Sequence, residues 1–144
     1  MLPLSMFCKQ ILKAEKSMRF VGIANNLGSL IATEYRECLT PLMTNEQTLQ
    51  YAIEAVLRAA IREEFESYIG KLEYSIGKHE KLVHATVPIT FENIPYKEGK
   101  NMKFYLLLSF DIDSDTETVI DKKILPSIKE NVGLDKTFLN LRRR

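Results

Sequence analysis

Three aspartates at alternate positions come nearest to a metal site in this sequence. Asp111, Asp113 and Asp115 occupy what would be the first, third and fifth positions of a calcium-binding loop. Such a loop also needs glycine at its sixth position and a bidentate glutamate at its twelfth, and this chain has Thr116 and Lys122 there. We interpret the segment instead as the end of a strand that enters a capped helix, where acidic side chains favour the positive end of the helix dipole. We expect no metal site.

The histidines and cysteines are too scattered to indicate catalysis. His79 and His84 are the only histidines, and we expect both at the surface, since a zinc site needs three or four converging ligands. Cys38 would need a base beside it to act as a nucleophile, and the sequence indicates none. Cys8 and Cys38 lack the spacing of a metal motif, and two cysteines in 144 residues are not typical of a secreted disulfide scaffold. We expect reduced thiols, although a disulfide is compatible with the sequence, and we expect no catalytic residues and no enzyme.

Charge and glycine content argue against several kinds of partner. The six glycines are scattered, whereas a phosphate loop needs them close together. The net charge of +1 disfavours bulk nucleic acid or an anionic membrane, with the terminal run 142–144 of three arginines as a local exception. No apolar run reaches the roughly 20 residues of a membrane span, and residues 1–8 do not resemble a signal peptide. We expect no cofactor and a cytoplasmic location.

The first elements follow from the periodicity of apolar residues. Residues 5–16 have near-helical spacing, and two strand-like segments, 18–24 and 30–33, follow. Asn25-Asn26-Leu27-Gly28 joins these segments with residues that tolerate positive φ. The pattern predicts a helix and then a β-hairpin.

A long amphipathic helix is predicted after the hairpin. Thr44 and Gln47 have the spacing of a capping box, and Gly70 stands where a helix could end. The helix has one stripe of mostly large apolar residues, which we expect to face the core: Leu49, Ile53, Val56, Leu57, Ala60, Ile61, Phe65 and Tyr68.

Three strands and a last helix complete the prediction. Strands are expected over 71–75 as a weak edge strand, over 82–91 and over 103–112, with a turn at 77–80 and a loop at 92–102 between them. In the second of these strands, one face is apolar: Val83, Ala85, Val87 and Ile89. The third strand is apolar enough to be buried on both faces.

The last helix carries a second capping box and a proline. Ser114 and Glu117 have the capping-box spacing. Pro126 should kink or tighten the helix near Lys122, because proline removes a helical hydrogen bond.

The element order α-β-β-α-β-β-β-α predicts one α+β domain over residues 1–131. A five-stranded antiparallel sheet would carry helices on its faces, and a short basic tail would follow over 132–144. The expected core residues are Val21, Ile23, Val56, Ile61, Phe65, Val87, Leu106, Leu108 and Ile120.

The hairpin resembles that of a known family. The strand 21–24, the Asn-rich turn that ends at Gly28 and the strand 30–32 are similar to the hairpin of the roadblock family, in the roadblock/longin/profilin-like group. The order of elements over 5–130 is similar too. The resemblance implies a dimer that acts as a scaffold or as a regulator of small GTPases, with no catalytic residues. The chain departs from the roadblock pattern in its longer loop at 92–102 and in its extension past the last helix. The loop at 35–42 also resembles a stretch of uncharacterised archaeal proteins.

The long helix has a second apolar surface beside its main stripe, made of alanines. A helix that covers one sheet face needs only the main stripe, so a second subunit could bury the alanines. We expect a homodimer interface that also includes the neighbouring edge strand: Ala52, Ala55, Ala59, Arg62, Leu72 and Tyr74. Ala55→Glu would then dissociate the dimer and leave the subunit folded. The alternative is a monomer whose helix is simply well packed.

Two functions of different classes fit the sequence. The first is a non-enzymatic protein-interaction module, a roadblock-like homodimeric scaffold or small-GTPase regulator. The second is a small-molecule sensor domain of PAS or GAF type, which would enclose a pocket between the sheet and a helix. The sequence identifies neither the protein partner nor the ligand.

Overall fold

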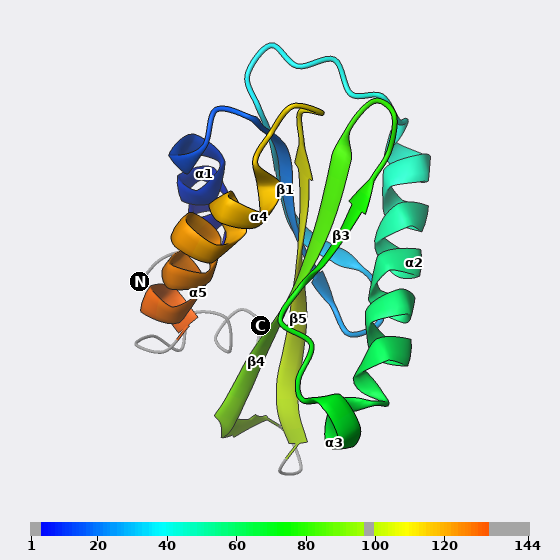
Figure 1. Cartoon of the computed structure of the whole chain (residues 1–144), viewed down its shortest axis with the longest axis vertical. Coiled ribbons are helices and arrows are strands. Elements are labelled where there is room, and N and C mark those ends of the chain that lie inside the picture. Colours follow the sequence, from blue (N-terminus) through cyan, green and yellow to red (C-terminus); the bar gives the residue numbers. More distant parts are fainter. Residues whose placement is uncertain (1–3, 97–99, 133–144) are drawn as a thin grey trace.

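A computed structural model describes residues 4–96 and 100–132 of the chain and shows one antiparallel sheet between two layers of helices (Figure 1). Helices α1, α4 and α5 lie on one face of the sheet, and α2 lies along the other. The elements are α1 (Leu4–Ala14), β1 (Met18–Asn25), β2 (Leu30–Tyr35), α2 (Asn45–Glu63), α3 (Glu66–Ile69), β3 (Ser75–Lys78), β4 (Val83–Tyr96), β5 (Lys100–Phe110), α4 (Thr116–Val119), a π-helical turn η1 (Ile120–Ile124) and α5 (Leu125–Val132). The five strands lie in the order β2-β1-β5-β4-β3, so the prediction of a five-stranded antiparallel α+β fold is confirmed. The basic tail predicted over 132–144 lies, from residue 133 on, outside the described residues.

The β1–β2 hairpin forms where the sequence predicts it. The Asn25 side chain accepts hydrogen bonds from the backbone N–H groups of Leu27 and Ser29, at 2.9 and 3.0 Å. Gly28 has φ of +84°, and a Cβ added there would lie 2.6 Å from the Cα of Ile53. The turn therefore needs glycine both for its backbone conformation and because it presses against the middle of α2.

Helix α2 begins with the predicted capping box. Gln47 N–H donates to Thr44 Oγ1 at 3.1 Å, and Thr44 N–H donates to the Gln47 side chain at 2.9 Å. The helix ends at Glu63, whereas the prediction extended it to Gly70. Gly70 instead ends the short helix α3, with φ of 90°.

Two strand boundaries differ from the prediction. The edge strand lies at 75–78 rather than 71–75, so that Gly77 and Lys78, expected in a turn, pair with His84 and Val83. The predicted loop over 92–102 is largely strand, because β4 extends to residue 96 and β5 starts at residue 100. Proline and asparagine usually mark loops, but here the ladder is irregular between residues 90 and 95, and an irregular ladder tolerates a proline.

The predicted second capping box does not form. Asp115, not Ser114, precedes helix α4, and its side chain makes no capping hydrogen bond. The Ser114 hydroxyl instead shares a hydrogen bond with the hydroxyl of Thr116. The helix nevertheless begins within two residues of the predicted position.

Pro126 widens the last helix rather than tightening it. Because Pro126 has no N–H, it cannot donate to the carbonyl of Lys122. The chain forms a π-helical turn directly before it, in which Leu125 N–H donates to the carbonyl of Ile120. The wider turn keeps both Ile120 and Ile124 fully buried.

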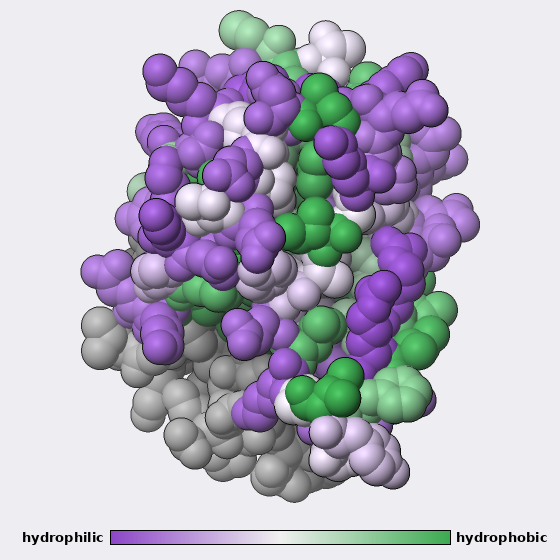
Figure 2. Space-filling view, viewed as in Figure 1, coloured by the Kyte–Doolittle hydropathy of each residue, from purple (hydrophilic) through white to green (hydrophobic). Residues whose placement is uncertain are grey.

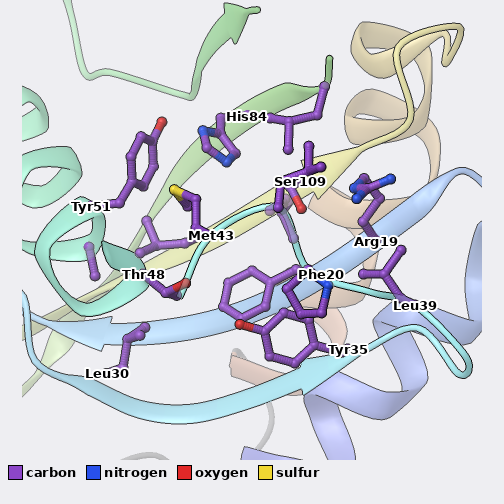
Figure 3. A pocket seen from close by; sticks show the side chains of 16 residues that line it. Arg19, Phe20, Leu30, Tyr35, Leu39, Met43, Thr48, Tyr51, His84 and Ser109 are labelled. Atoms are coloured by element: carbon purple, nitrogen blue, oxygen red, sulfur yellow. The ribbon is translucent and has the colours of Figure 1, made fainter. Parts of the chain in front are cut away.

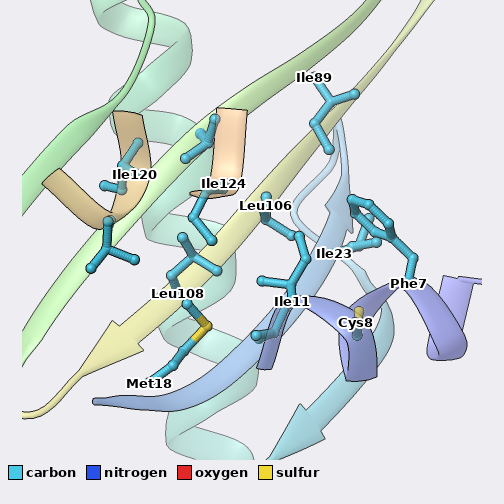
Figure 4. Packing of buried hydrophobic residues seen from close by; sticks show 14 of the residues in the cluster. Phe7, Cys8, Ile11, Met18, Ile23, Ile89, Leu106, Leu108, Ile120 and Ile124 are labelled. Carbon is cyan, nitrogen blue, oxygen red and sulfur yellow. The ribbon is translucent and has the colours of Figure 1, made fainter. Parts of the chain in front are cut away.

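Two separate clusters of buried residues form the core. The larger cluster fills the space between the sheet and the layer of α1, α4, η1 and α5 (Figure 4). Its largest fully buried side chains are Phe7, Ile11, Met18, Ile23, Ile89, Phe104, Leu106, Leu108, Phe110, Ile120 and Ile124. The smaller cluster lies between the sheet and α2: Ala24, Ala52, Ala55, Val56, Ala59, Tyr105 and Leu107.

The predicted core is confirmed except at two positions. The predicted residues that are buried are Val21, Ile23, Val56, Val87, Leu106, Leu108 and Ile120. The predictions for Ile61 and Phe65 are wrong, since each side chain is 51% exposed. Ile61 lies in the last turn of α2, and Phe65 lies just after the helix ends.

The two cysteines are free thiols in different environments. Cys8 is buried in the larger cluster, and burial, followed by the charge of Glu34, raises its pKa to about 12. Cys38 is exposed in the loop after β2 and has a positive φ of 61°. Burial keeps the Cys8 thiol protonated, which makes it a packing residue.

Candidate functional site

Most of the apolar stripe that the sequence assigned to the core lies at the surface, although Val56 is buried. Five large apolar residues, spaced four apart, are each between 51% and 58% exposed: Leu49, Ile53, Leu57, Ile61 and Phe65. We call this set the outer ridge. Leu49 to Ile61 span about three turns, or roughly 18 Å, of α2, and Phe65 lies just beyond the end of the helix. A monomer gains nothing from such a stripe at its surface, and exposed apolar patches of this kind mark interaction sites.

The alanines of α2 face the sheet instead. Ala52, Ala55 and Ala59 are each 1% exposed and pack with Tyr105 and Leu107 of β5. The sheet side of this interface is bulky, so small residues are needed on the helix side. The prediction that these alanines form a subunit interface is therefore wrong, because the chain's own sheet covers them.

The other three predicted interface residues come together beside the outer ridge. Arg62, Leu72 and Tyr74 line one hollow of about 610 Å³, together with Phe65 and Ile69. The Tyr74 hydroxyl also donates to Asp121 at 3.2 Å. Figure 2 shows apolar surface gathered at the end of α2 and over α3 on this side of the molecule. That Arg62, Leu72 and Tyr74 belong to a subunit interface stays a prediction.

Strand β3 forms one edge of the sheet next to this surface. It pairs with β4 through residues 75–78, and within the described ranges the sheet has no strand beyond it. Ile76 on this strand is 40% exposed. A short edge strand with an exposed apolar residue can accept another strand by backbone hydrogen bonding.

The carboxylate of Asp111 is held by two arginines. Arg36 donates to it at 2.8 Å and Arg19 at 3.3 Å. The hydrogen bond from Arg36, more than that from Arg19, holds the pKa of Asp111 below its usual value. Asp111 therefore ties the start of the loop at 36–43 to the end of β5. Over residues 4–96 and 100–132, no three metal-binding side chains converge.

The loop at 36–43 covers the α2 side of the sheet and leaves a small cavity beneath it. Phe20, Tyr35, Leu39 and Met43 are among its lining residues, together with polar groups such as His84 (Figure 3). Its volume is about 50 Å³. That is room for a few water molecules but not for a ligand that needs about 300–1,000 Å³.

His84 lines this cavity beside Tyr51 of α2. Its ring centroid lies 4.1 Å from that of Tyr51 on α2 and 5.5 Å from that of His79. Burial above all, and then the charges of His79 and Arg58, lower its pKa to about 4. Its Nδ1 atom is buried and has no hydrogen-bond partner in the described part of the chain.

His79 is exposed as expected, whereas His84 is half-buried rather than fully at the surface. A signal was present, because position 84 falls between the core residues Val83 and Ala85 and so must face the other helix layer. Sequence reasoning placed the residue on that face but assumed that the face was exposed.

The fold and its surface can now be compared with known proteins. No protein-family model matches the sequence, and no curated protein resembles it in sequence. Solved structures do resemble the fold. A Roadblock/LC7 domain from Streptomyces avermitilis superposes with a TM-score of 0.63 at 8% identity, covering 89% of this chain and 93% of that one. MglB from Myxococcus xanthus superposes with a TM-score of 0.62 at 14% identity, covering 88% and 89%.

A structure described as MglB with a tetrameric arrangement is also similar, with a TM-score of 0.64, 12% identity and coverage of 86% and 81%. At such low identities the comparison establishes the fold alone. The chain has a roadblock-like fold, as the hairpin resemblance implied. No helix in the described residues is long and apolar enough to cross a membrane.

Proposed function

We propose that this chain is a cytoplasmic, non-enzymatic interaction module that forms a homodimer and serves as a scaffold or as a regulator of a small GTPase. The outer ridge of α2 carries the proposal. Five large apolar side chains along α2 and just past its end, each about half exposed, cost free energy unless a partner covers them.

A second copy is the simplest partner for this surface. A two-fold axis that crosses α2 near Leu57, the middle residue of the ridge, would set the ridge against itself, so that apolar side chains meet apolar side chains. The neighbouring edge strand β3 could then extend the contact. A stable interface of this kind buries at least about 1,000 Å².

The role as scaffold or GTPase regulator rests on the fold. The resemblance to roadblock-like domains implies this role, and the similar structures include MglB and a Roadblock/LC7 domain. The described residues also offer no cysteine nucleophile hydrogen-bonded to a base. Cys8 is buried with a raised pKa, and Cys38 is an exposed free thiol in the loop after β2.

Sedimentation at micromolar concentration tests the homodimer. We expect the wild type to sediment as a dimer and Leu57→Glu as a monomer, because the substitution puts a charge at the centre of the ridge. Met6→Glu is the matched control, since Met6 is a 46% exposed apolar residue on α1, on the other side of the sheet. It should stay dimeric. Circular dichroism should show both variants folded.

A monomeric wild type would contradict the homodimer, and so would a dimeric Leu57→Glu variant. Ala55→Glu, expected from the sequence to dissociate the dimer, should instead unfold the subunit, since Ala55 is 1% exposed against the sheet. A sensor of PAS or GAF type is not proposed, because the two hollows between the sheet and α2, of about 50 and 210 Å³, are smaller than the roughly 300–1,000 Å³ of a ligand pocket.

A further inference from the structure

A second hollow, which we call the cationic pocket, opens between α2 and the β3–β4 edge. Its volume is about 210 Å³, several times that of the cavity under the loop. Four basic side chains line it: Arg58, Arg62, His79 and His84. Aspartate and glutamate are absent from its lining within the described residues.

The basic side chains come from both layers that form the pocket. Arg58 and Arg62 are four residues apart on α2 and so share one helix face. Arg58 lies over the ring of Tyr51, with 5.2 Å between its guanidinium carbon and the ring centroid. In the described part of the chain neither arginine has a carboxylate partner within salt-bridge distance, whereas Arg19 and Arg36 both bind Asp111.

The charged groups that act on His84 are all basic. Tyr51 and Arg58 from α2 and His79 from the β3–β4 turn face His84, and the charges of Arg58 and His79 both disfavour its protonation. Glu54, whose charge acts on Tyr51, does not line the pocket. Meanwhile the buried Nδ1 of His84 lacks any hydrogen-bond partner. Both ring nitrogens of His84 are donors when the imidazole is protonated, so an anion in the pocket would favour that form.

We infer that the cationic pocket binds the phosphate group of a small ligand, with Arg62 and Arg58 as its cationic donors and His84 as a buried donor at its inner wall. Guanidinium groups match phosphate oxygens with two parallel hydrogen bonds. Donors from α2 on one side and the histidines on the other suit an anion with several oxygens. The hydroxyl group of Ser75 also lines the hollow. Binding would couple to protonation: a bound anion raises the pKa of His84 above its free value, so affinity should increase as the pH falls.

Inorganic phosphate is the probe for this site. Carbon-13 NMR of the histidine rings, at constant ionic strength set with sodium chloride, should show saturable shifts of His84 with a Kd of about 1 mM or tighter. Phosphate should also raise the pKa of His84 above about 4, its value in the free pocket. Acetate, in a parallel titration, distinguishes a carboxylate ligand from a phosphate and should bind more weakly.

Arg62→Gln should weaken phosphate binding by at least about tenfold, since it removes a charged donor. Lys13→Gln is the matched control, because it removes one exposed positive charge on α1, on the opposite layer, and should leave binding unchanged. The inference would be overturned if the His84 shifts in phosphate matched those in sodium chloride alone. It would also be overturned if the Arg62→Gln variant bound phosphate as the wild type does. Tighter binding of acetate than of phosphate would overturn it as well.

The pocket borders the surface of the proposed homodimer, and the two ideas can fail separately. Sedimentation reports the dimer, whereas the phosphate titration reports the pocket and can be repeated on Leu57→Glu. If the His84 shifts follow protein concentration and ignore phosphate, a second copy fills the pocket and the phosphate inference is wrong.

Discussion

The two faces of the sheet are covered by helices that use side-chain bulk in opposite ways. On the α1 face, both layers contribute large residues, such as Phe7 and Ile11 from the helix and Leu106 from β5. On the α2 face, Tyr105 and Leu107 of the same strand supply the bulk and the helix supplies alanine. A helix with two apolar stripes can therefore bury the smaller one, and its large residues are then left for a partner.

The largest expected effect comes from truncating a large side chain on the α1 face. Leu106→Ala should lower the free energy of unfolding by about 2–5 kcal/mol, because Leu106 is fully buried and its loss leaves a cavity. Urea unfolding measures the change. A loss within about 0.5 kcal/mol, the range of surface substitutions, would remove Leu106 from the core.

On the α2 face the damaging change is the substitution of a small side chain by a larger one. Ala55→Leu should cost about 1–3 kcal/mol, because the side chain would be forced against Tyr105 and Leu107. Ala60→Leu is the matched control on the same helix, since Ala60 is exposed, and should be nearly neutral. If the two variants unfold at the same urea concentration, α2 does not sit on the sheet through its alanines.

The hairpin turn tests how closely the β-sheet approaches α2. Gly28→Ala should cost more than the roughly 1–3 kcal/mol of backbone strain alone, because the new Cβ would also meet Ile53 at 2.6 Å. Gly70→Ala provides the comparison: its φ is also positive, at +90°, but nothing lies within 4 Å. Thermal unfolding of both variants should place Gly28→Ala lower. The reverse order would show that the turn does not contact α2.

The smallest effect concerns an ion pair on the α1 face. Hydrogen bonds from Lys123, and then from Ser17, lower the pKa of Glu15 from 4.5 to about 2. The carboxylate therefore stabilises the folded chain above about pH 4.5, and this contribution is lost as the pH falls toward 2.

Lys123→Met should cost less than about 1 kcal/mol at pH 7, because Lys123 is 46% exposed and solvent screens the pair, and should flatten the loss of stability between pH 5 and pH 3. Urea unfolding at these pH values measures both. Lys122→Met, the neighbouring exposed lysine, should leave the pH dependence as in the wild type.

Much of the fold follows from local patterns. Thr44 and Gln47 predict the start of α2, and the turn at Asn25 and Gly28 predicts the hairpin, because these features depend on hydrogen bonds and φ angles a few residues apart. Local patterns did not predict how far strands β4 and β5 extend. Pro95 indicates a loop on its own, yet it lies in β4, where the strand ladder is irregular and tolerates it.

The candidate site was predicted only in part. Arg62, Leu72 and Tyr74 were expected at one surface and do line one hollow. His84 and Arg58 were not expected to matter, because their importance comes from neighbours on other elements. No local spacing reports that a histidine nitrogen is buried without a partner.

The sequence by itself determined the elements, their order and the two apolar stripes of α2, since periodicity records which residues share a face. Only the tertiary structure decided which stripe is buried. That choice depends on the shape of the sheet beneath the helix. Tyr105 and Leu107 rise from β5 and leave room only for Ala52, Ala55 and Ala59, so the outer ridge remains exposed and the pocket of Arg58, Arg62 and His84 can form beside it.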